Sequence, residues 1–262
     1  MVDTTIEKEV EIEAEASAPE TEVEHYVEGE FDHTVEHSDT YYEEYIASYV
    51  PNTKRRLFYR FVKRTFDIFM SFWMLVFLSP VLLAVAIAVK CDSEGPAIFK
   101  QKRMGRNGKE FYCYKFRSMR IDAPKNTATS LLENPEQYQT RVGRVIRKLS
   151  LDELPQLWCV LIGNMSFIGY RPLVLTEAKC NDMRARLNVF SMRPGISGYA
   201  QVYGRDDVHY KNKAVMDSIY VKNASLIFDL KMIFKTVAVV LLREGNQDAA
   251  PTKKESEKAA ER

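Results

Sequence analysis

The chain has 262 residues, of which 46% are hydrophobic and 28% charged, and its formal net charge is +1. This near-neutral total hides a strong asymmetry. Residues 1–50 carry sixteen acidic side chains and one lysine, a net charge of −15, whereas the remaining residues carry 36 basic and 20 acidic side chains, a net charge of +16. An acidic segment therefore precedes a basic body that is long enough to form one domain with its own core.

The cysteines and histidines limit the possible chemistry. The four cysteines lie far apart and form no Cys-x-x-Cys pair, so we expect neither a structural zinc site nor a disulfide framework. His209 is the only one of the four histidines that follows residue 50, which excludes a two-histidine metal centre in the body. A Ser-His-Asp or Cys-His mechanism would depend on His209 alone. Carboxylates and basic side chains must therefore carry the chemistry.

Both ends of the chain have the composition of flexible tails. Residues 1–50 are rich in glutamate and lack a sustained apolar period, which predicts an acidic disordered tail. Their tyrosines leave open a short segment that binds a protein partner. Residues 245–262 mix acidic and basic side chains and predict a second flexible tail. The acidic start and the late first apolar run argue against a secretory signal.

The most pronounced apolar run covers residues 68–89, which are 22 successive residues without a charge. A straight helix of this length would measure about 33 Å, enough to cross the apolar core of a bilayer. A helix in a soluble core is rarely apolar on every face. We therefore expect a helix over about residues 64–90 to insert into a membrane.

Two features argue against a simple crossing. Ser79 and Pro80 interrupt the run, and a proline removes one helical hydrogen bond and clashes with the preceding turn. Basic residues flank the run on both sides, which favours the cytoplasm for both ends. A re-entrant helix that bends at Ser79 and Pro80 satisfies both observations, because the Ser79 hydroxyl can satisfy a freed backbone group. A kinked helix that crosses once remains the alternative.

The other patterns indicate short elements and an α+β fold that is mostly helical. Residues 92–120 are turn-rich and basic, with a short strand expected at 111–116. An amphipathic helix is expected around 136–149, an apolar segment at 154–163, and helices at 173–190, 208–222 and 226–242. The last helix suits either a membrane interface or a buried core.

Asp152 and Glu153 are the first candidates for chemistry. Adjacent carboxylates close to Arg147 and other basic side chains can hold a divalent cation and a phosphate together. We expect Ser150 to cap a helix that begins near Asp152, which would fix both carboxylates at the positive end of that helix. The alternative is that the pair is only a helix-capping feature.

Two turns present an arginine in a rigid frame: Gly-Tyr-Arg-Pro at 169–172 and Arg-Pro-Gly-Ile-Ser-Gly at 193–198. Proline fixes the backbone, glycine permits close approach, and a guanidinium can bind a phosphate. Lys115 and Arg117 form a further basic pair. Taken alone, the turns are equally typical of ordinary loops, and the basic pair is equally typical of a membrane-facing strand.

The order of the motifs carries more information than any one of them. They are KRTFDI (63–68), the apolar helix broken at Ser-Pro, GPAIFKQKRMGRNGKEFYCYKFRSM (95–119), TRVGRVIRKLSLDELPQL (140–157), GNMSFIGYRP (163–172), RPGISGYAQVYGR (193–205), MDSIYVKNASLIFDLK (216–231) and KTV (235–237). In this order, over roughly residues 54–244, the chain resembles the bacterial sugar transferase family. Its members are monotopic enzymes at the cytoplasmic face of the bacterial cell membrane.

The resemblance implies an activity. A sugar phosphate passes from a UDP-sugar to undecaprenyl phosphate and UMP is released, as the first membrane step of exopolysaccharide, capsule or O-antigen synthesis. It also implies that Asp152 is the nucleophile of a covalent phosphosugar intermediate, that Glu153 supports it in metal binding or proton handling, and that Mg²⁺ is required. The implied substrate- or phosphate-binding residues are Lys115, Arg147, Arg171, Arg193, Arg205 and Asp217.

Three positions depart from the family pattern: Tyr170 stands in place of a proline, Cys159 in place of an asparagine and His209 in place of a tryptophan. They concern loop rigidity and sugar choice rather than the reaction. A different hypothesis is a non-enzymatic membrane adaptor, whose basic body binds anionic lipid and whose acidic tail recruits a partner. No nucleic-acid-binding motif accompanies the basic residues, so nucleic acid is not an expected partner.

Overall fold

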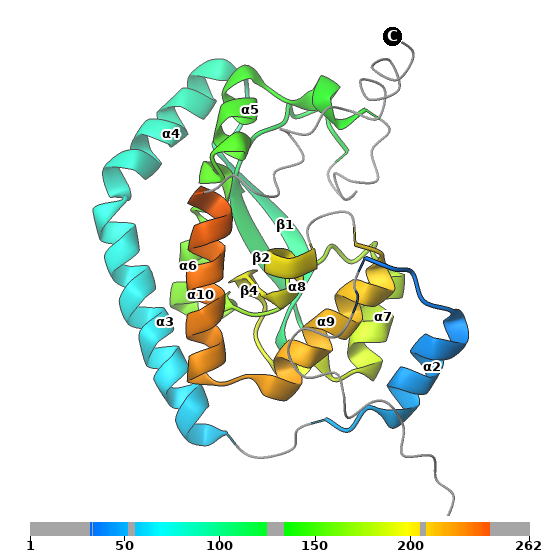
Figure 1. Cartoon of the computed structure of the whole chain (residues 1–262). Helices are drawn as coiled ribbons and strands as arrows, with labels where there is room; N and C mark the ends of the chain where they lie inside the picture. Colours follow the sequence, from blue (N-terminus) through cyan, green and yellow to red (C-terminus); the bar gives the residue numbers. More distant parts are fainter. Residues whose placement is uncertain (1–31, 33, 52–55, 125–133, 205–207, 242–262) are drawn as a thin grey trace, which may run out of the picture. The chain divides into compact units, whose positions relative to one another are not determined.

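The computed structural model describes residues 32, 34–51, 56–124, 134–204 and 208–241 (Figure 1). The chain divides into two units, Met1–Val50 and Pro51–Arg262. Most of the acidic tail, all of the tail predicted at 245–262 and the candidate Arg205 lie outside the described residues.

The first unit contains one described helix, α2 (Asp39–Ser48). The composition predicted no regular structure here, and for these ten residues that prediction is wrong. The reason is local. The Ser38 hydroxyl accepts a hydrogen bond from the Tyr41 backbone at 3.2 Å, and the His37 ring stacks on Tyr41 with centroids 4.3 Å apart. A capping residue and a ring stack offset the poor helix propensity of this acidic segment.

The second unit begins with two helices, α3 (Leu57–Phe77) and α4 (Ser79–Asp92), which are bent by 62° (Figure 1). The interruption predicted at Ser79 and Pro80 is confirmed. Pro80 lies in the first turn of α4, where its missing N–H costs nothing. The Ser79 hydroxyl donates to the Val76 carbonyl at 2.7 Å. Among the described residues no single helix has the length and apolarity of a membrane crossing, although the bent pair together does.

Helix α3 is polar on its buried face and apolar on its exposed face. Tyr59, Lys63, Asp67 and Ser71 recur every four residues and so share one face. Three of them, Tyr59, Asp67 and Ser71, are the buried residues of the helix. The exposed large apolar residues of α3 are Leu57, Phe58, Phe61, Phe66, Ile68, Phe69, Phe72, Trp73, Val76 and Phe77. This is the reverse of a helix that packs on a water-soluble core.

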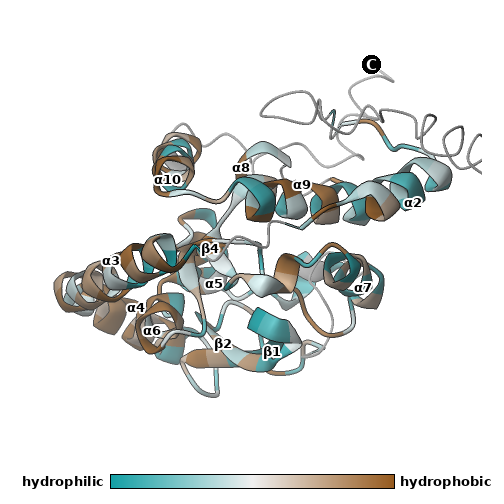
Figure 2. Ribbon diagram, turned by 90° about the horizontal axis from the view of Figure 1, so that it is seen from below, coloured by the Kyte–Doolittle hydropathy of each residue, from teal (hydrophilic) through white to brown (hydrophobic). Residues whose placement is uncertain are grey.

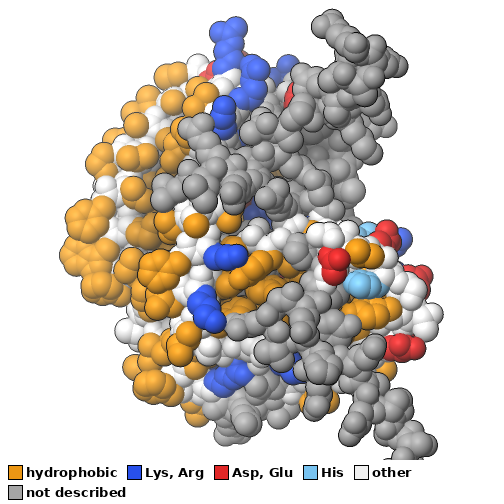
Figure 3. All heavy atoms as spheres, in the orientation of Figure 1, with side chains coloured by type: hydrophobic (Ala, Val, Ile, Leu, Met, Phe, Trp, Pro, Cys, Tyr) orange, Lys and Arg blue, Asp and Glu red, His pale blue; other side chains and the backbone are white. Residues whose placement is uncertain are grey.

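The apolar surface continues onto α4. Figures 2 and 3 show that hydrophobic residues line α3 and α4 and gather on the face that these two helices form. On α4 the exposed large residues are Val81, Leu83 and Ile87, and only Val85 and Val89 are buried. A continuous apolar surface of this kind marks a site of contact with a membrane or another apolar partner.

A β-hairpin follows. Strand β2 (Glu110–Phe116) confirms the strand predicted at 111–116, and it pairs in antiparallel fashion with β1 (Ile98–Met104). The sequence predicted only turns at 98–104. A short 3₁₀ turn, η2 (Arg106–Gly108), links the strands, with Asn107 in the left-handed region at φ 58°.

The remaining elements are short until the last two helices. They are η4 (Pro135–Tyr138), α5 (Arg141–Lys148), η5 (Leu151–Glu153), α6 (Gln156–Ile162), β3 (Ser166–Ile168), α7 (Ala178–Arg186), η6 (Val189–Ser191), β4 (Gly195–Ser197), α8 (Tyr199–Gly204), α9 (Tyr210–Asn223) and α10 (Leu226–Leu241). Strands β3 and β4 pair in parallel. The helices predicted at 208–222 and 226–242 are confirmed as α9 and α10.

Two predicted helices are shorter than expected. Of residues 136–149 only 141–148 are α-helical, because Thr140 caps α5 by accepting from the Gly143 backbone at 2.9 Å. Of residues 173–190 only 178–186 form α7. Val174 instead forms a bridge with Arg103 of β1, and Asn188 ends the helical region with φ 52°. Tertiary contacts and a left-handed residue therefore set these boundaries.

Two clusters of buried apolar side chains hold the hairpin. One joins α4, β2 and α5 through Val85, Val89, Phe116 and Ile146, and Leu151 packs against it. The other joins β2, α6 and the segment before β3 through Cys113, Cys159, Val160 and Met165. Lys115 lies on β2 between residues of both clusters, so the strand that carries it is fixed on either side.

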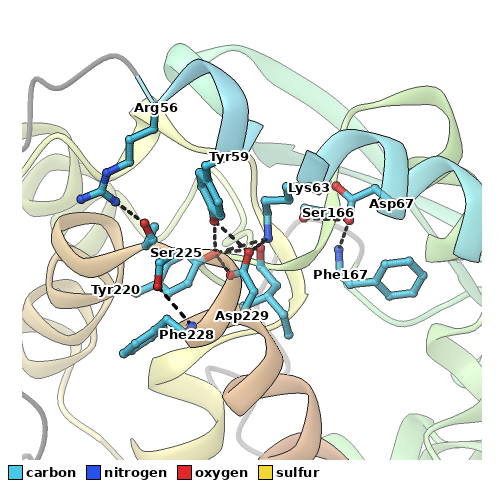
Figure 4. A network of polar contacts seen from close by, with 12 residues as sticks. Arg56, Tyr59, Lys63, Asp67, Ser166, Phe167, Tyr220, Ser225, Phe228 and Asp229 are labelled. Atoms are coloured by element: carbon cyan, nitrogen blue, oxygen red, sulfur yellow. Dashed lines mark hydrogen bonds and ion pairs between the residues drawn. The ribbon is translucent and has the colours of Figure 1, made fainter. Parts of the chain in front are cut away.

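A buried polar network joins α3 to α9 and α10 (Figure 4). The Asp229 carboxylate accepts from Lys63 at 2.8 Å, from the Tyr59 hydroxyl at 2.8 Å and from the Tyr220 hydroxyl at 2.7 Å. Asp229 is 7% exposed. The opposite side of α10 exposes Leu226, Ile227, Leu230, Phe234 and Val237. Helix α10 thus combines a polar inner contact with an apolar outer face.

Candidate active site

The Asp152–Glu153 pair lies on the 3₁₀ turn η5 and not on a helix. Ser150 adopts the left-handed conformation at φ 55° and its side chain makes no capping hydrogen bond, so the predicted N-cap is wrong. Helix α6 begins only at Gln156. Leu151 packs against the cluster that joins α4, β2 and α5. This apolar anchor, rather than a cap, holds the turn that carries the two carboxylates.

Glu153 is held by two cations from distant parts of the chain. The Lys115 ammonium on β2 lies 2.5 Å from its Oε1, and the Arg171 guanidinium lies 3.5 Å from the same oxygen. Burial alone would raise the pKa of Glu153, but Lys115 and Arg171 outweigh it and lower this pKa to about 2. Glu153 is therefore ionised at neutral pH and fixed in direction.

Asp152 has a different environment. It is 8% exposed, and within the described part of the chain its carboxylate has no hydrogen-bond or ion-pair partner. Burial raises the pKa of Asp152, while Lys115 and Arg147 oppose the rise. An unpaired, largely buried carboxylate beside a fixed one is costly for the free energy of folding, which makes the position a candidate for chemistry.

The segment after Lys115 ties the site to the bent helices. Arg117 is 5% exposed, and its guanidinium donates to the Ser93 carbonyl at 2.6 Å and to the Ser93 hydroxyl at 2.9 Å, just past the end of α4. The Asp92 carboxylate of α4 accepts from the Val142 backbone of α5 at 2.9 Å. Hydrogen bonds therefore join the apolar helices to the segments that carry the site, and Arg117 serves packing rather than the carboxylates.

The loop that carries Arg171 is held by two further arginines. Arg103 of β1 donates to the Pro172 carbonyl, and Arg184 of α7 donates to the Arg171 carbonyl at 2.9 Å. Sequence reasoning missed both. Arg103 lies in a basic stretch of many similar residues, and Arg184 is one of several charged residues in the helix predicted at 173–190. No periodicity reveals a contact between such distant segments.

The structure does not bring every candidate to the carboxylate pair. Arg147 is half-buried and close enough to oppose the rise in the pKa of Asp152. Arg193 instead donates to the Gly163 carbonyl at 2.8 Å, just after α6. Asp217 is 1% exposed and pairs with Arg184 at 2.5 Å. Neither of these last two touches Asp152 or Glu153.

The carboxylate oxygens of Asp152 and Glu153 fit a Mg²⁺ site that is completed by a substrate phosphate. Among the described residues no three metal-binding side chains form a group. Mg²⁺ is commonly held by one or two carboxylates together with substrate phosphates and water. Asp152 offers a carboxylate that no described residue pairs with, whereas one oxygen of Glu153 is engaged by Lys115. The pair therefore fits a cation that binds together with a phosphorylated substrate.

Comparison with known proteins agrees with this geometry. The sequence model of the family described as "Bacterial sugar transferase" matches residues 58–243, which contain the elements above except α2 and the first residue of α3. The chain belongs to the bacterial sugar transferase family. The match covers the bent helices, the hairpin, the carboxylate pair and the Arg171 loop in one continuous stretch.

Individual relatives cover this same region. The chain is 43% identical over 202 residues, 71% of its length, to "Undecaprenyl-phosphate galactose phosphotransferase" of Salmonella typhimurium, and the match spans 42% of that protein. It is 38% identical over 198 residues to "Exopolysaccharide production protein ExoY" of Sinorhizobium fredii, covering 70% of this chain and 87% of that one. It is 38% identical over 208 residues to "UDP-N-acetylgalactosamine-undecaprenyl-phosphate N-acetylgalactosaminephosphotransferase" of Aeromonas hydrophila, covering 78% and 48%. The chain thus spans less than half the length of two of these relatives.

Proposed function

We propose that this protein transfers a sugar phosphate from a UDP-sugar to undecaprenyl phosphate and releases UMP. The observation that carries the proposal is the carboxylate of Asp152, which pairs with none of the residues that the structure describes, beside a glutamate held by Lys115 and Arg171. The names of two relatives contain undecaprenyl phosphate and a sugar phosphotransferase activity, and one of them also contains UDP-N-acetylgalactosamine, which supports the same chemistry. The product is a lipid-linked sugar diphosphate, the starting point of a surface polysaccharide or glycoconjugate.

The reaction proceeds in two displacements at one phosphorus atom. An Asp152 oxygen attacks the sugar-bearing phosphorus of the UDP-sugar, the bond to the bridging oxygen breaks, and UMP leaves with that electron pair. A phosphate oxygen of undecaprenyl phosphate then attacks the same phosphorus and releases the Asp152 carboxylate. A carboxylate needs no base to become nucleophilic at neutral pH, so His209 is not required.

The neighbouring cations have distinct tasks. Lys115 fixes Glu153, and Arg171, whose side chain is 38% exposed, would direct part of its guanidinium toward a phosphate. Asp152 and Glu153 would hold Mg²⁺. When bound, Mg²⁺ neutralises negative charge on the diphosphate and so permits a carboxylate to approach it.

We further propose that α3 and α4 lie in the cytoplasmic leaflet as a re-entrant pair. The reversed polarity of α3, the 62° bend and the exposed apolar face of α10 support this arrangement. The contact from Arg117 to the end of α4 then holds the carboxylate pair near the depth of lipid phosphates. Basic residues on both flanks suit anionic headgroups.

Turnover tests the activity. Purified protein in detergent is given undecaprenyl phosphate, Mg²⁺ and, in separate reactions, UDP-glucose, UDP-galactose and the UDP-N-acetylhexosamines. We expect UMP release with at least one donor, lost on chelation of Mg²⁺. Absence of UMP release with every donor would favour the adaptor hypothesis.

Cysteine accessibility tests the topology. Cys91, near the end of α4, is exposed, whereas Cys113, Cys159 and Cys180 are buried. Arg60→Cys in a Cys91→Ser background gives a matched site near the start of α3. A membrane-impermeant maleimide should label both sites in inside-out vesicles and neither in right-side-out ones. Labelling of the two sites from opposite sides would establish a single crossing.

A further inference from the structure

Arg184 is a fully buried arginine that touches the candidate active site only through the backbone. It lies on α7 with 1% of its side chain exposed. Its Nη2 pairs with the Asp217 carboxylate of α9 at 2.5 Å, and its Nη1 donates to the Arg171 carbonyl at 2.9 Å. The ion pair is thus attached to the residue whose side chain contacts Glu153.

The burial of this pair calls for an explanation. Removing two charges from water is expensive, and an apolar pair of similar volume is often as stable. Asp217 and Arg184 are each 1% exposed, so solvent does not offset that cost. The benefit that the structure reveals is geometric. A guanidinium locked by Asp217 presents a second N–H group to the Arg171 carbonyl in a fixed direction.

Tyr170 completes the support from the other side. Its ring lies 5.4 Å from the Arg184 guanidinium and meets Phe190 edge-on at 5.5 Å, and the residue is 0% exposed. Its carbonyl accepts from the Gly195 backbone at 2.8 Å. The family pattern places a proline at this position, which would stiffen the loop through its ring. In this chain a buried aromatic ring stacked on Arg184 restrains the residue before Arg171.

We propose that Arg184, held by Asp217 and stacked on Tyr170, is a positioning residue that sets the direction of Arg171 toward Glu153 and the substrate phosphate. The expected effect on UMP release rests on the proposed function. The expected effect on the Arg171 loop does not. It reassigns Asp217, which the resemblance implied as a substrate-binding residue. Asp217 acts on the reaction through Arg184 and Arg171.

The kinetic test is a double-mutant cycle on UMP release. Arg184→Lys keeps the charge but loses the fork that reaches both partners. We expect kcat/KM to fall about tenfold to a hundredfold, as for a small misplacement of a binding group. Arg171→Lys should lower it comparably, and the double variant should be no worse than Arg171→Lys alone. The exposed neighbour Arg186→Gln, on the same helix, is the matched control. Additive losses, or wild-type kcat/KM in a folded Arg184→Lys variant, would overturn the inference.

Hydrogen exchange tests the structural part without reference to activity. Amides of residues 167–173 should exchange at least about tenfold faster in Arg184→Lys than in Arg186→Gln, because the loop loses one anchor. Unchanged exchange refutes the inference, even if the wild type is active. If the wild type releases no UMP but exchange rises, the proposed function fails and the positioning role stands. Should Arg184→Lys not fold, Tyr170→Leu keeps Arg184 and its ion pair but removes the ring contacts with Arg184 and Phe190, and the same two measurements apply with the same outcomes.

Discussion

Two carboxylates of this protein, Asp229 and Asp152, are buried to a similar extent but differ in their hydrogen-bond partners. Asp229 on α10 accepts hydrogen bonds from Lys63, Tyr59 and Tyr220, so its oxygens are engaged from three sides (Figure 4). Asp152 on η5 is buried to nearly the same extent, yet no described residue pairs with it. We call the contacts of Asp229 with Lys63, Tyr59 and Tyr220 the closed network. We call the contacts around Asp152 and Glu153 the open network.

The difference separates a structural group from a chemical one. A carboxylate whose two oxygens both accept hydrogen bonds from buried neighbours stabilises those neighbours and has little capacity left for a ligand. In the open network Lys115 and Arg171 form their ion pairs with Glu153. Asp152 is therefore available to a cation and a phosphorus atom. The comparison therefore yields opposite expectations for variants in the two networks.

The largest effect should come from the closed network. Asp229→Asn leaves the Lys63 ammonium buried without its charge partner, which should lower the free energy of unfolding by about 3 kcal/mol. The kcat/KM per folded molecule should remain near wild type. Chemical denaturation in detergent measures the first quantity and UMP release the second. Lys231→Gln, exposed on the same helix, is the control. A stable Asp229→Asn variant with low kcat/KM would reverse the assignment of the two networks.

In the open network a substitution should lower kcat/KM strongly and the free energy of unfolding only slightly. Lys115→Met frees Glu153 to turn, and we expect kcat/KM to fall about tenfold to a hundredfold. Since the pair is partly exposed, at 19% and 22%, the free energy of unfolding should fall by only about 1 kcal/mol. Lys100→Met, on the outer face of the same hairpin, is the matched control. A large loss of stability with unchanged kcat/KM would show that this ion pair, too, is structural.

A substitution at the bend between α3 and α4 should change the free energy of unfolding least. Pro80→Ala supplies an N–H group that can continue the helix through Leu78, at a cost or gain of less than about 1 kcal/mol. The topology should respond instead: the fraction of Cys91 labelled in inside-out vesicles should fall as the pair straightens. Val81→Ala serves as the control. Unchanged labelling would mean that packing against α5 and β2, rather than the proline, sets the bend.

Local chemistry made part of the fold predictable. Proline is favoured in the first turn of a helix and breaks or kinks a helix elsewhere, and the aromatic residues of 111–116 favour a strand, so the break at Pro80 and β2 follow from the sequence. Strand β1 was missed because its alternate residues, Lys100 and Lys102, are charged and suggested a basic turn. Pairing with β2, and not propensity, makes it a strand.

The candidate site was predictable in its members but not in its connections. The motifs pointed to Lys115, Glu153 and Arg171, and the structure brings these three together. No local pattern reveals that Arg184 pairs with Asp217 over 33 residues, or that Lys63 reaches Asp229 over 166. Such contacts depend on helix packing, which a residue spacing does not encode. The roles assigned to Arg193 and Arg147 stay predictions, and Arg205 lies outside the described residues.

The central claim is that Asp152 forms a bond to phosphorus. Its most direct test is mass spectrometry of protein quenched after incubation with Mg²⁺ and an active UDP-sugar in the absence of undecaprenyl phosphate. We predict that the peptide containing Asp152 gains the mass of one sugar phosphate, that added undecaprenyl phosphate removes it, and that Asp152→Asn abolishes both the adduct and UMP release. An adduct on another residue, or full turnover by Asp152→Asn, would contradict the account.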